Sequence, residues 1–170
     1  MPEIIPRNPQ VEGYGFREQY MYNLECDEIF RKNEPPIKAV MENFFTPAKK
    51  FLNVDDTKAI IKKADLNLNE NKIIIYYAES LMTRIDTLSD LSVMQQMKYV
   101  EFLCFISRIA HELYKGTKQE SIGLHFKIDA IMTPIFDAYN EHKLFSFKEG
   151  AEEGEEGEDD DDDEEEEEEE

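Results

Sequence analysis

The segment "YVEFLCFISRIAHELY", residues 99–114, constrains the fold more than any other part of the sequence. Its apolar residues cover most of the circumference of a helix, and a helix that is apolar nearly all round is buried on most of its sides. We therefore expect a central core helix with other helices packed around it, ended at Gly116. The predicted fold class is all-α. The apolar residues concerned are Val100, Phe102, Leu103, Cys104, Phe105, Ile106, Ile109, Ala110 and Leu113.

Two segments before residue 50 have the periodicity of amphipathic helices. Residues 16–32 permit one helix, which ends at "NEPP" because the residue before a proline avoids the helical region. Pro36 then opens a second helix, since proline is tolerated in the first turn. The apolar stripe of this second helix consists of Ile37, Val40, Met41, Phe44 and Phe45.

Three further helices are predicted after residue 50. "NVDDTKAIIKKADL" has a cap, acids in its first turn and lysines in its last, which favours a short helix from Asn53 to Ala64. A helix is also favoured for residues 70–86, although the β-prone "IIIYY" leaves a strand as the alternative. The last helix contains Pro134, where we expect a kink. The helix over residues 70–86 packs through Ile74, Tyr77, Ala78, Leu81 and Ile85, and the last helix through Leu124, Ile128, Ile131, Ile135, Phe136 and Tyr139.

The charge distribution divides the chain into three parts. The net charge is −20, but residues 149–170 hold 18 of the 39 acidic residues and no basic one, so the remainder is nearly neutral. A block of like charges with almost no apolar residues does not fold alone, and we expect a disordered acidic tail. Prolines and glycines near the start predict an extended N-terminal arm. The expected division is an arm (1–15), a helical domain (16–148) and the tail (149–170).

The stretch "DLNLNENKIIIY", which starts at Asp65, begins like a calcium-binding loop. Such a loop has twelve places, with oxygen ligands at places 1, 3, 5, 7, 9 and 12, a glycine at place 6 and a bidentate glutamate at place 12. Here Glu70 stands at place 6, Ile73 at place 9 and Tyr76 at place 12. We therefore expect this stretch to start a helix that is capped by Asn69 or Asn71, rather than to bind calcium.

Two other alignments fit the second half of a calcium loop better. With Asp90 at place 1, Ser92 falls at place 3, Met97 at place 8 and Glu101 at place 12, but Met94 and Gln95 occupy places 5 and 6. In the earlier helix pair, Leu52 and Asp56 fill places 8 and 12 of a loop that contains Pro47 and cannot chelate. No metal is expected, and the candidates should calcium bind weakly are Asp90, Ser92 and Glu101.

These segments resemble degenerate EF-hand pairs of ciliary and other cytoskeletal proteins, over about residues 36–115. The residues that carry the resemblance are "IKAVMENFF", "KFLNVDDTKAIIKKADL", "MTRID" and "MKYVEFLCFISRIAHELY". The distance from Leu52 to Met97, 97 − 52 = 45 residues, exceeds that of tandem hands and weakens the expected pairing of the two loops. The resemblance implies a helical scaffold that binds other proteins, often in axonemes, and assigns no catalytic or metal-binding residue.

Charge also suggests how the chain contacts partners. A group of lysines around the third predicted helix is either a solvated face or a docking surface for an acidic partner, such as a microtubule or the chain's own tail: Lys49, Lys50, Lys58, Lys62 and Lys63. The tail resembles a tubulin tail in composition, which implies side-chain glutamylation or glycylation at Glu152, Glu153, Glu155, Glu156 and Glu158. A solubility tail and an acidic chaperone of basic proteins remain alternatives.

Several classes of function lack the residues they need. The three histidines are isolated, and HExxH, GxSxG, P-loop and GxGxxG motifs do not occur, so no enzyme and no cofactor is expected. The overall negative charge repels phosphate backbones, which argues against nucleic acid. No run of about 18 apolar residues occurs, so no membrane is expected. Cys26 and Cys104 fall in apolar helical patterns, as free thiols of an intracellular protein do. The expected location is the cytoplasm or cytoskeleton, in particular the cilium.

Overall fold

A computed structural model describes residues 15–81 and 96–147, and within these ranges the chain is all-α. Two isolated β-bridges are the only strand-like pairings there, which confirms the fold class and excludes the strand alternative for "IIIYY". The predicted tail and all of the predicted arm except Gly15 lie outside the described residues. The elements are η1, a π-helix (Arg17–Met21), α2 (Leu24–Lys32), α3 (Glu34–Glu42), α4 (Val54–Lys63), α5 (Glu70–Ser80), α6 (Tyr99–Leu113) and α7 (Leu124–Ala138).

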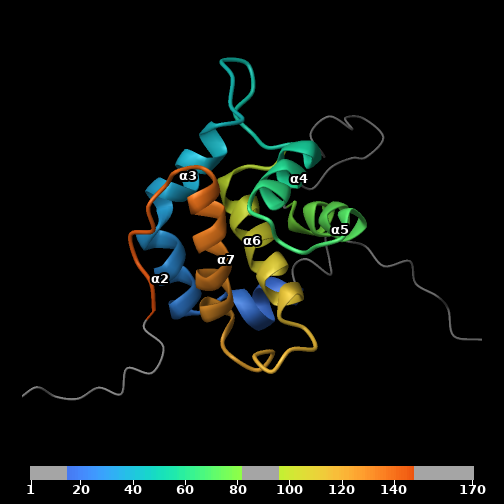
Figure 1. Cartoon of the computed structure of the whole chain (residues 1–170), viewed down its shortest axis with the longest axis vertical. Helices are drawn as coiled ribbons and strands as arrows, with labels where there is room; N and C mark the ends of the chain where they lie inside the picture. The colour runs from blue at the N-terminus through green and yellow to red at the C-terminus, as the bar shows by residue number, and fades with distance from the viewer. Residues whose placement is uncertain (1–14, 82–95, 148–170) are drawn as a thin grey trace, which may run out of the picture.

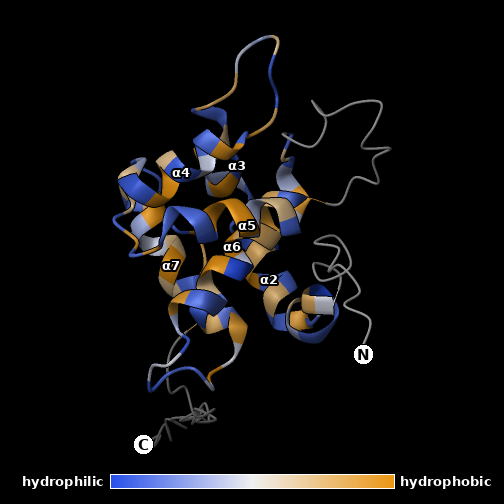
Figure 2. Cartoon of the chain, turned by 90° about the vertical axis from the view of Figure 1, so that its right-hand side faces the viewer, coloured by the Kyte–Doolittle hydropathy of each residue, from blue (hydrophilic) through white to orange (hydrophobic). Residues whose placement is uncertain are grey.

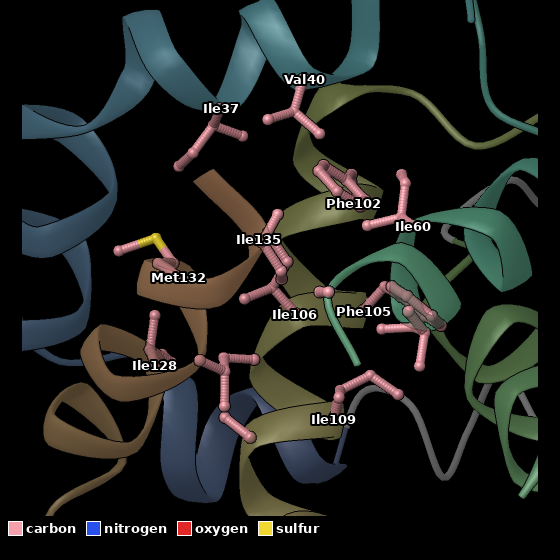
Figure 3. Close-up of a cluster of buried hydrophobic side chains, with 14 of the residues drawn as sticks. Ile37, Val40, Ile60, Phe102, Phe105, Ile106, Ile109, Ile128, Met132 and Ile135 are labelled. Atoms are coloured by element: carbon pink, nitrogen blue, oxygen red, sulfur yellow. The ribbon is translucent and has the colours of Figure 1, made fainter. Parts of the chain in front are cut away.

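Helix α6 occupies the centre of the molecule, as its sequence predicts (Figure 1). It packs against both α5 and α7, and η1 contacts it as well, while α7 also packs against α2, α3 and α4. Figure 3 shows Phe102 and Phe105 of α6 among side chains from α3, α4 and α7. Both phenylalanines are 1% exposed, so they join the surrounding helices into one hydrophobic core.

Two apolar residues that the sequence places in the core are exposed. Val100 on α6 is 53% exposed and Ile74 on α5 is 43% exposed, so these two expectations are wrong. Helix α5 buries Ile73 in place of Ile74, one turn from Tyr77, which is buried as expected. Figure 2 shows the apolar stretches of α5 and α6 next to each other in the middle of the molecule. Ile85 lies outside the described residues.

The single helix expected over residues 16–32 is divided into η1 and α2. Tyr22 and Asn23 leave the helical path between them, and Asn23 takes an extended conformation. Its side-chain oxygen accepts a hydrogen bond from the backbone N–H of Cys26 at 2.9 Å, which starts α2 with a new cap. The chain therefore changes direction at a residue type that favours helix starts.

The predicted helix starts differ in accuracy. Helix α3 begins at Glu34, two residues earlier than expected, because both prolines fit in its first turn. It ends at Glu42, so Phe44 and Phe45 lie beyond it and are half-buried. The expected bounds of α4, Asn53 to Ala64, coincide with its two caps. Asn69 caps α5, as expected, by accepting from the N–H of Asn71 at 2.8 Å.

The segment that follows α7, residues 139–147, is held by hydrogen bonds at the junction of α2 and α3. The buried side chain of Asn33 donates to the backbone oxygens of Ile29 and Phe145, both at 2.9 Å. Its oxygen accepts from the N–H groups of Leu144 and Phe145 at 2.9 and 3.2 Å. The ammonium of Lys143 also pairs with Asp129 on α7. These contacts hold the end of the domain against its own helices.

Candidate functional site

A two-residue β-bridge joins the starts of α4 and α6. The N–H of Leu52 donates to the oxygen of Met97 and the N–H of Met97 donates to the oxygen of Leu52, both at 2.8 Å. Both residues are 0% exposed. The hydroxyl of Tyr77 on α5 also donates to the oxygen of Leu52, at 2.9 Å. The bridge connects two halves, which we define as the first half (α3, α4 and residues 43–53 between them) and the second half (α5 and α6).

Leu52 and Met97 pair directly, although the long connection between them was expected to weaken this pairing. The two positions are 45 residues apart in the sequence, and a longer connection costs only a little more closure entropy per added residue. The two buried side chains and two short hydrogen bonds offset that cost. The two positions therefore pair despite the long connection between them.

The two halves repeat one spacing on either side of the bridge. Asn53 follows Leu52 and caps α4, and the carboxylate of Asp56 accepts from the N–H of Asn53 at 3.0 Å. The N–H of Asp56 in turn donates to the side-chain oxygen of Asn53 at 2.9 Å. In the second half, Lys98 follows Met97 and donates its N–H to the carboxylate of Glu101 at 3.1 Å. A lysine side chain has no acceptor, so only one of the two cap bonds forms there.

Glu101 is the one weak calcium candidate that lies in the described residues. It is 5% exposed, and its carboxylate accepts from the N–H of Lys98 at the start of α6. Asp90 and Ser92 lie outside the described residues. In residues 15–81 and 96–147, no group of three or more His, Cys, Asp or Glu side chains is placed to hold a metal ion.

The loop of the first half brings a lysine to the acid that caps α4. Residues 46 and 49 pair through backbone hydrogen bonds of 2.9 and 3.1 Å, which form a tight turn above α4. The ammonium of Lys49 forms an ion pair with the carboxylate of Asp56, and both side chains are mostly buried. Asp56 thus receives a backbone N–H from one side and a cation from the other.

The predicted lysine group is only partly a free surface. Lys49 is engaged with Asp56, and the ammonium of Lys63 lies 4.3 Å from the ring centre of Tyr139. Lys58 and Lys62 line a surface hollow of about 320 Å³ between α4 and α5, which Asp65 and Glu70 also line. Lys50 is exposed in the loop of the first half. Lys50, Lys62 and Lys63 are exposed and Lys58 is half-buried, so four members of the group remain accessible to a partner.

A polar cluster between α5 and α6 escaped sequence reasoning. Partial burial alone would raise the pKa of Glu112, but hydrogen bonds from Lys72, Tyr76 and Lys115 outweigh burial and lower that pKa to about 2. Nearby, the guanidinium of Arg108 donates to the carboxylate of Glu79 at 2.9 Å. The spacing of Tyr76 and Glu79 on α5 places them on one face. This spacing is visible in the sequence, but it does not identify the partners of the two side chains.

The two thiols are poorly suited to nucleophilic chemistry. Both are buried and unbonded to sulfur, which confirms their predicted state. Burial raises the pKa of Cys26 to about 11 and also raises the pKa of Cys104, so both stay protonated near neutral pH. The carboxylates of Asp56, Glu79, Glu101 and Glu112 are likewise held by caps or ion pairs. The geometry therefore favours a structural role for these groups.

No protein-family model, no curated protein and no solved structure matches the chain. Among the described helices, none combines the length and the apolar character needed to cross a bilayer. The predicted tail-modification residues, Glu152, Glu153, Glu155, Glu156 and Glu158, lie outside the described residues.

Proposed function

We propose that the chain is a non-catalytic structural or adaptor protein built on a pair of EF-hand-like units that fold without calcium. The observation that carries this proposal is the Leu52–Met97 bridge between the two halves. Both residues fall at place 8 when each segment is aligned on a twelve-place calcium loop. A cap at place 9 and an acid at place 12 follow in both halves, as Asn53 with Asp56 and as Lys98 with Glu101.

Lys49 supplies a reason why the first loop needs no metal. In the same alignment it occupies place 5, where a calcium loop has an oxygen ligand, and Asp56 occupies place 12. Its ammonium pairs with the Asp56 carboxylate, so the positive charge that a metal would bring is covalently part of the chain. Pro47 at place 3 offers no side-chain oxygen either. These features support a fixed framework over a calcium sensor.

The inner surface of the two halves supports the same proposal. Helix α7 packs against α3, α4 and α6, and its Ile128, Met132 and Ile135 side chains point into the core between them (Figure 3). The chain therefore covers the apolar side of the pair with its own helix. Partners must use outer surfaces, and Lys50, Lys58 and Lys62 offer one for acidic protein partners.

We further propose that the partners belong to a microtubule-based assembly, with the ciliary axoneme as the expected location. The resemblance of the helical segments and the composition of the tail support this setting. The calcium-responsive regulator and the acidic-tailed chaperone remain the alternative functions, because Glu101 could still ligate weakly and the tail could occupy basic proteins.

The first test separates the scaffold from the calcium regulator. The full chain is titrated with calcium, with magnesium as the matched control, across the roughly 10⁻⁷ to 10⁻⁵ M range in which EF-hand sensors respond, while heat and far-ultraviolet circular dichroism are recorded. We expect no heat of binding and no change in helicity. Saturable heat with a gain of helicity that Glu101→Gln removes would replace the scaffold with a calcium regulator.

The second test addresses the partner. We expect the full chain to co-sediment with microtubules, and the double variant Lys58→Glu, Lys62→Glu to lose most of that binding. The double variant Lys38→Glu, Lys118→Glu changes the net charge equally at exposed sites elsewhere and should bind as the original does. Equal loss in both variants would indicate unspecific attraction, and retention on histones that depends on residues 149–170 would favour the chaperone.

A further inference from the structure

An apolar groove of about 590 Å³ runs along the outside of the molecule between the η1–α2 turn and the first turns of α6. Phe30 lies at its buried base, and Leu103 contributes from α6. Three large side chains at its rim are strongly exposed: Leu24 at 72%, Tyr22 at 60% and Val100 at 53%. The groove belongs neither to the bridge nor to the lysine surface, so the proposed function gives it no role.

The exposure of these side chains indicates that another segment or molecule binds in the groove. Scattered apolar residues on a protein surface are ordinary, but a contiguous patch around a groove marks a binding site. Three of the seven strongly exposed large apolar residues in the described ranges lie at this one groove. Among the residues that line it, Asp27 alone carries a charge. The occupant should therefore be mainly apolar with a single basic group.

We propose that residues 1–14 of the same chain occupy this groove, with Ile4 and Ile5 between Leu24 and Val100. The segment "MPEIIPRNPQVEGY" contains the apolar residues that such a groove accepts, and Arg7 is its one basic side chain, two residues after Ile5 and available to Asp27. Pro2, Pro6 and Pro9 favour an extended backbone, which loses less conformational entropy on docking than a flexible one.

The connection of this segment to the groove supports an intramolecular contact. Gly15 leads directly into η1, and Met21 at the other end of η1 lines the groove. A π-helix of five residues spans less than about 10 Å, whereas fourteen extended residues reach about 46 Å at roughly 3.3 Å per residue. The segment can therefore turn back along η1 and still place Ile4 and Ile5 in the groove.

Trypsin cleavage after Arg7 tests the proposal in the full chain. Release of residues 1–7 is followed by mass spectrometry, and a synthetic peptide of residues 1–14 gives the unprotected rate. We expect the full chain to be cleaved at Arg7 about tenfold more slowly than the peptide, because cleavage tracks the undocked population. Leu24→Glu, and separately the double variant Ile4→Asp, Ile5→Asp, should raise the rate to within about threefold of the peptide.

Leu144→Glu is the matched control, because Leu144 is a strongly exposed leucine (61%, against 72% for Leu24) outside the groove. It should keep the slow rate, and circular dichroism should show all variants folded. Cleavage of the original chain at the peptide's rate would overturn the proposal. So would slow cleavage that persists in Leu24→Glu, or protection that appears only at concentrations where sedimentation shows a dimer, since the groove would then hold a second copy.

Discussion

The two halves of the molecule start their second helices at the same distance from the bridge but hold the capping acid in different ways. In the first half, Asp56 exchanges two hydrogen bonds with Asn53 and also pairs with Lys49. In the second half, Glu101 accepts from the N–H of Lys98 and is 5% exposed. One acid is neutralised by a cation from its own loop, and the other is buried at the start of the central helix.

This difference shows that an acid in the first turn serves the helix start in two different surroundings. A carboxylate in the first turn satisfies a backbone N–H that has no partner inside the helix, and it interacts favourably with the helix dipole. That role exists with or without a metal. The contribution of each acid to stability then depends on its surroundings, because α4 lies at the side of the domain and α6 at its centre (Figure 1).

The largest expected loss of stability comes from a core substitution in α6, the central helix. Phe105→Ala should lower the free energy of unfolding by about 3–5 kcal/mol, because it removes a large side chain that is 1% exposed and leaves a cavity. Ile60→Ala on α4 should lower it by less, about 2–3 kcal/mol. Urea denaturation of both variants gives the comparison. An equal or larger loss in Ile60→Ala would mean that the first half carries as much of the core as the second.

The second prediction concerns the pH dependence of the contact between α5 and α6. The pKa of Glu112 is about 2 in the folded protein, below its usual value, so its stabilisation is complete above about pH 4.5 and is lost as the pH falls toward 2. We expect a loss of about 2 kcal/mol, reduced from the full linkage value because Lys72 and Lys115 are half-exposed.

Urea denaturation between pH 5 and pH 2, done on the original chain and on Glu112→Gln, isolates this contribution from that of the other carboxylates. The difference between the two curves should shrink as the pH falls through this range. A difference that stays constant from pH 5 to pH 2 would contradict the lowered pKa of Glu112.

The third prediction tests the contact of α5 with the bridge. Tyr77→Phe removes the hydroxyl that donates to the oxygen of Leu52, and it should cost about 1 kcal/mol. The cost stays modest because this oxygen still accepts from Met97. Tyr22→Phe is the control, since Tyr22 is 60% exposed and should change stability by less than about 0.5 kcal/mol. Equal effects in thermal denaturation would show that the hydroxyl does not support the bridge.

The prediction with the smallest expected effect concerns Lys49, the cation of the first half. A double-mutant cycle with Lys49→Met and Asp56→Asn should give a coupling energy of about 0.5–1 kcal/mol, because both side chains are mostly buried. Asn keeps an acceptor for the N–H of Asn53, so the cycle isolates the ion pair. The exposed pair of Lys38 with Glu34 should couple more weakly, by about 0.3 kcal/mol. No difference between the two cycles would remove the role assigned to Lys49.

The accuracy of the sequence predictions follows the range of the interactions involved. The bounds of α4 and the cap of α5 were predictable, because Asn53, Asp56 and Asn69 bond to groups two or three residues away. The division of residues 16–32 was missed although Asn23 forms the same kind of cap. The apolar pattern around it suggested continuity, and periodicity alone does not show where a backbone leaves the helical path.

The candidate site was predictable only in its parts. Leu52, Asp56, Met97 and Glu101 stood out because they fit one spacing, whereas the ion pair of Lys49 with Asp56 has no signal in the sequence. Val100 was placed in the core because it lies within an apolar run, yet it faces the groove beside Leu24. Which side of an apolar helix stays open depends on the elements that arrive there.

The sequence by itself determined the all-α class, the central position of α6 and the caps, because these depend on apolar periodicity and on bonds between near neighbours. Tertiary structure alone decided the Leu52–Met97 bridge and the fastening of residues 139–147 by Asn33. Asn33 meets Phe145 across 112 residues, and any polar residue that the fold buries must find such partners. The physical reason is that local bonds form within one turn, whereas distant groups meet only after the core has fixed where each helix lies.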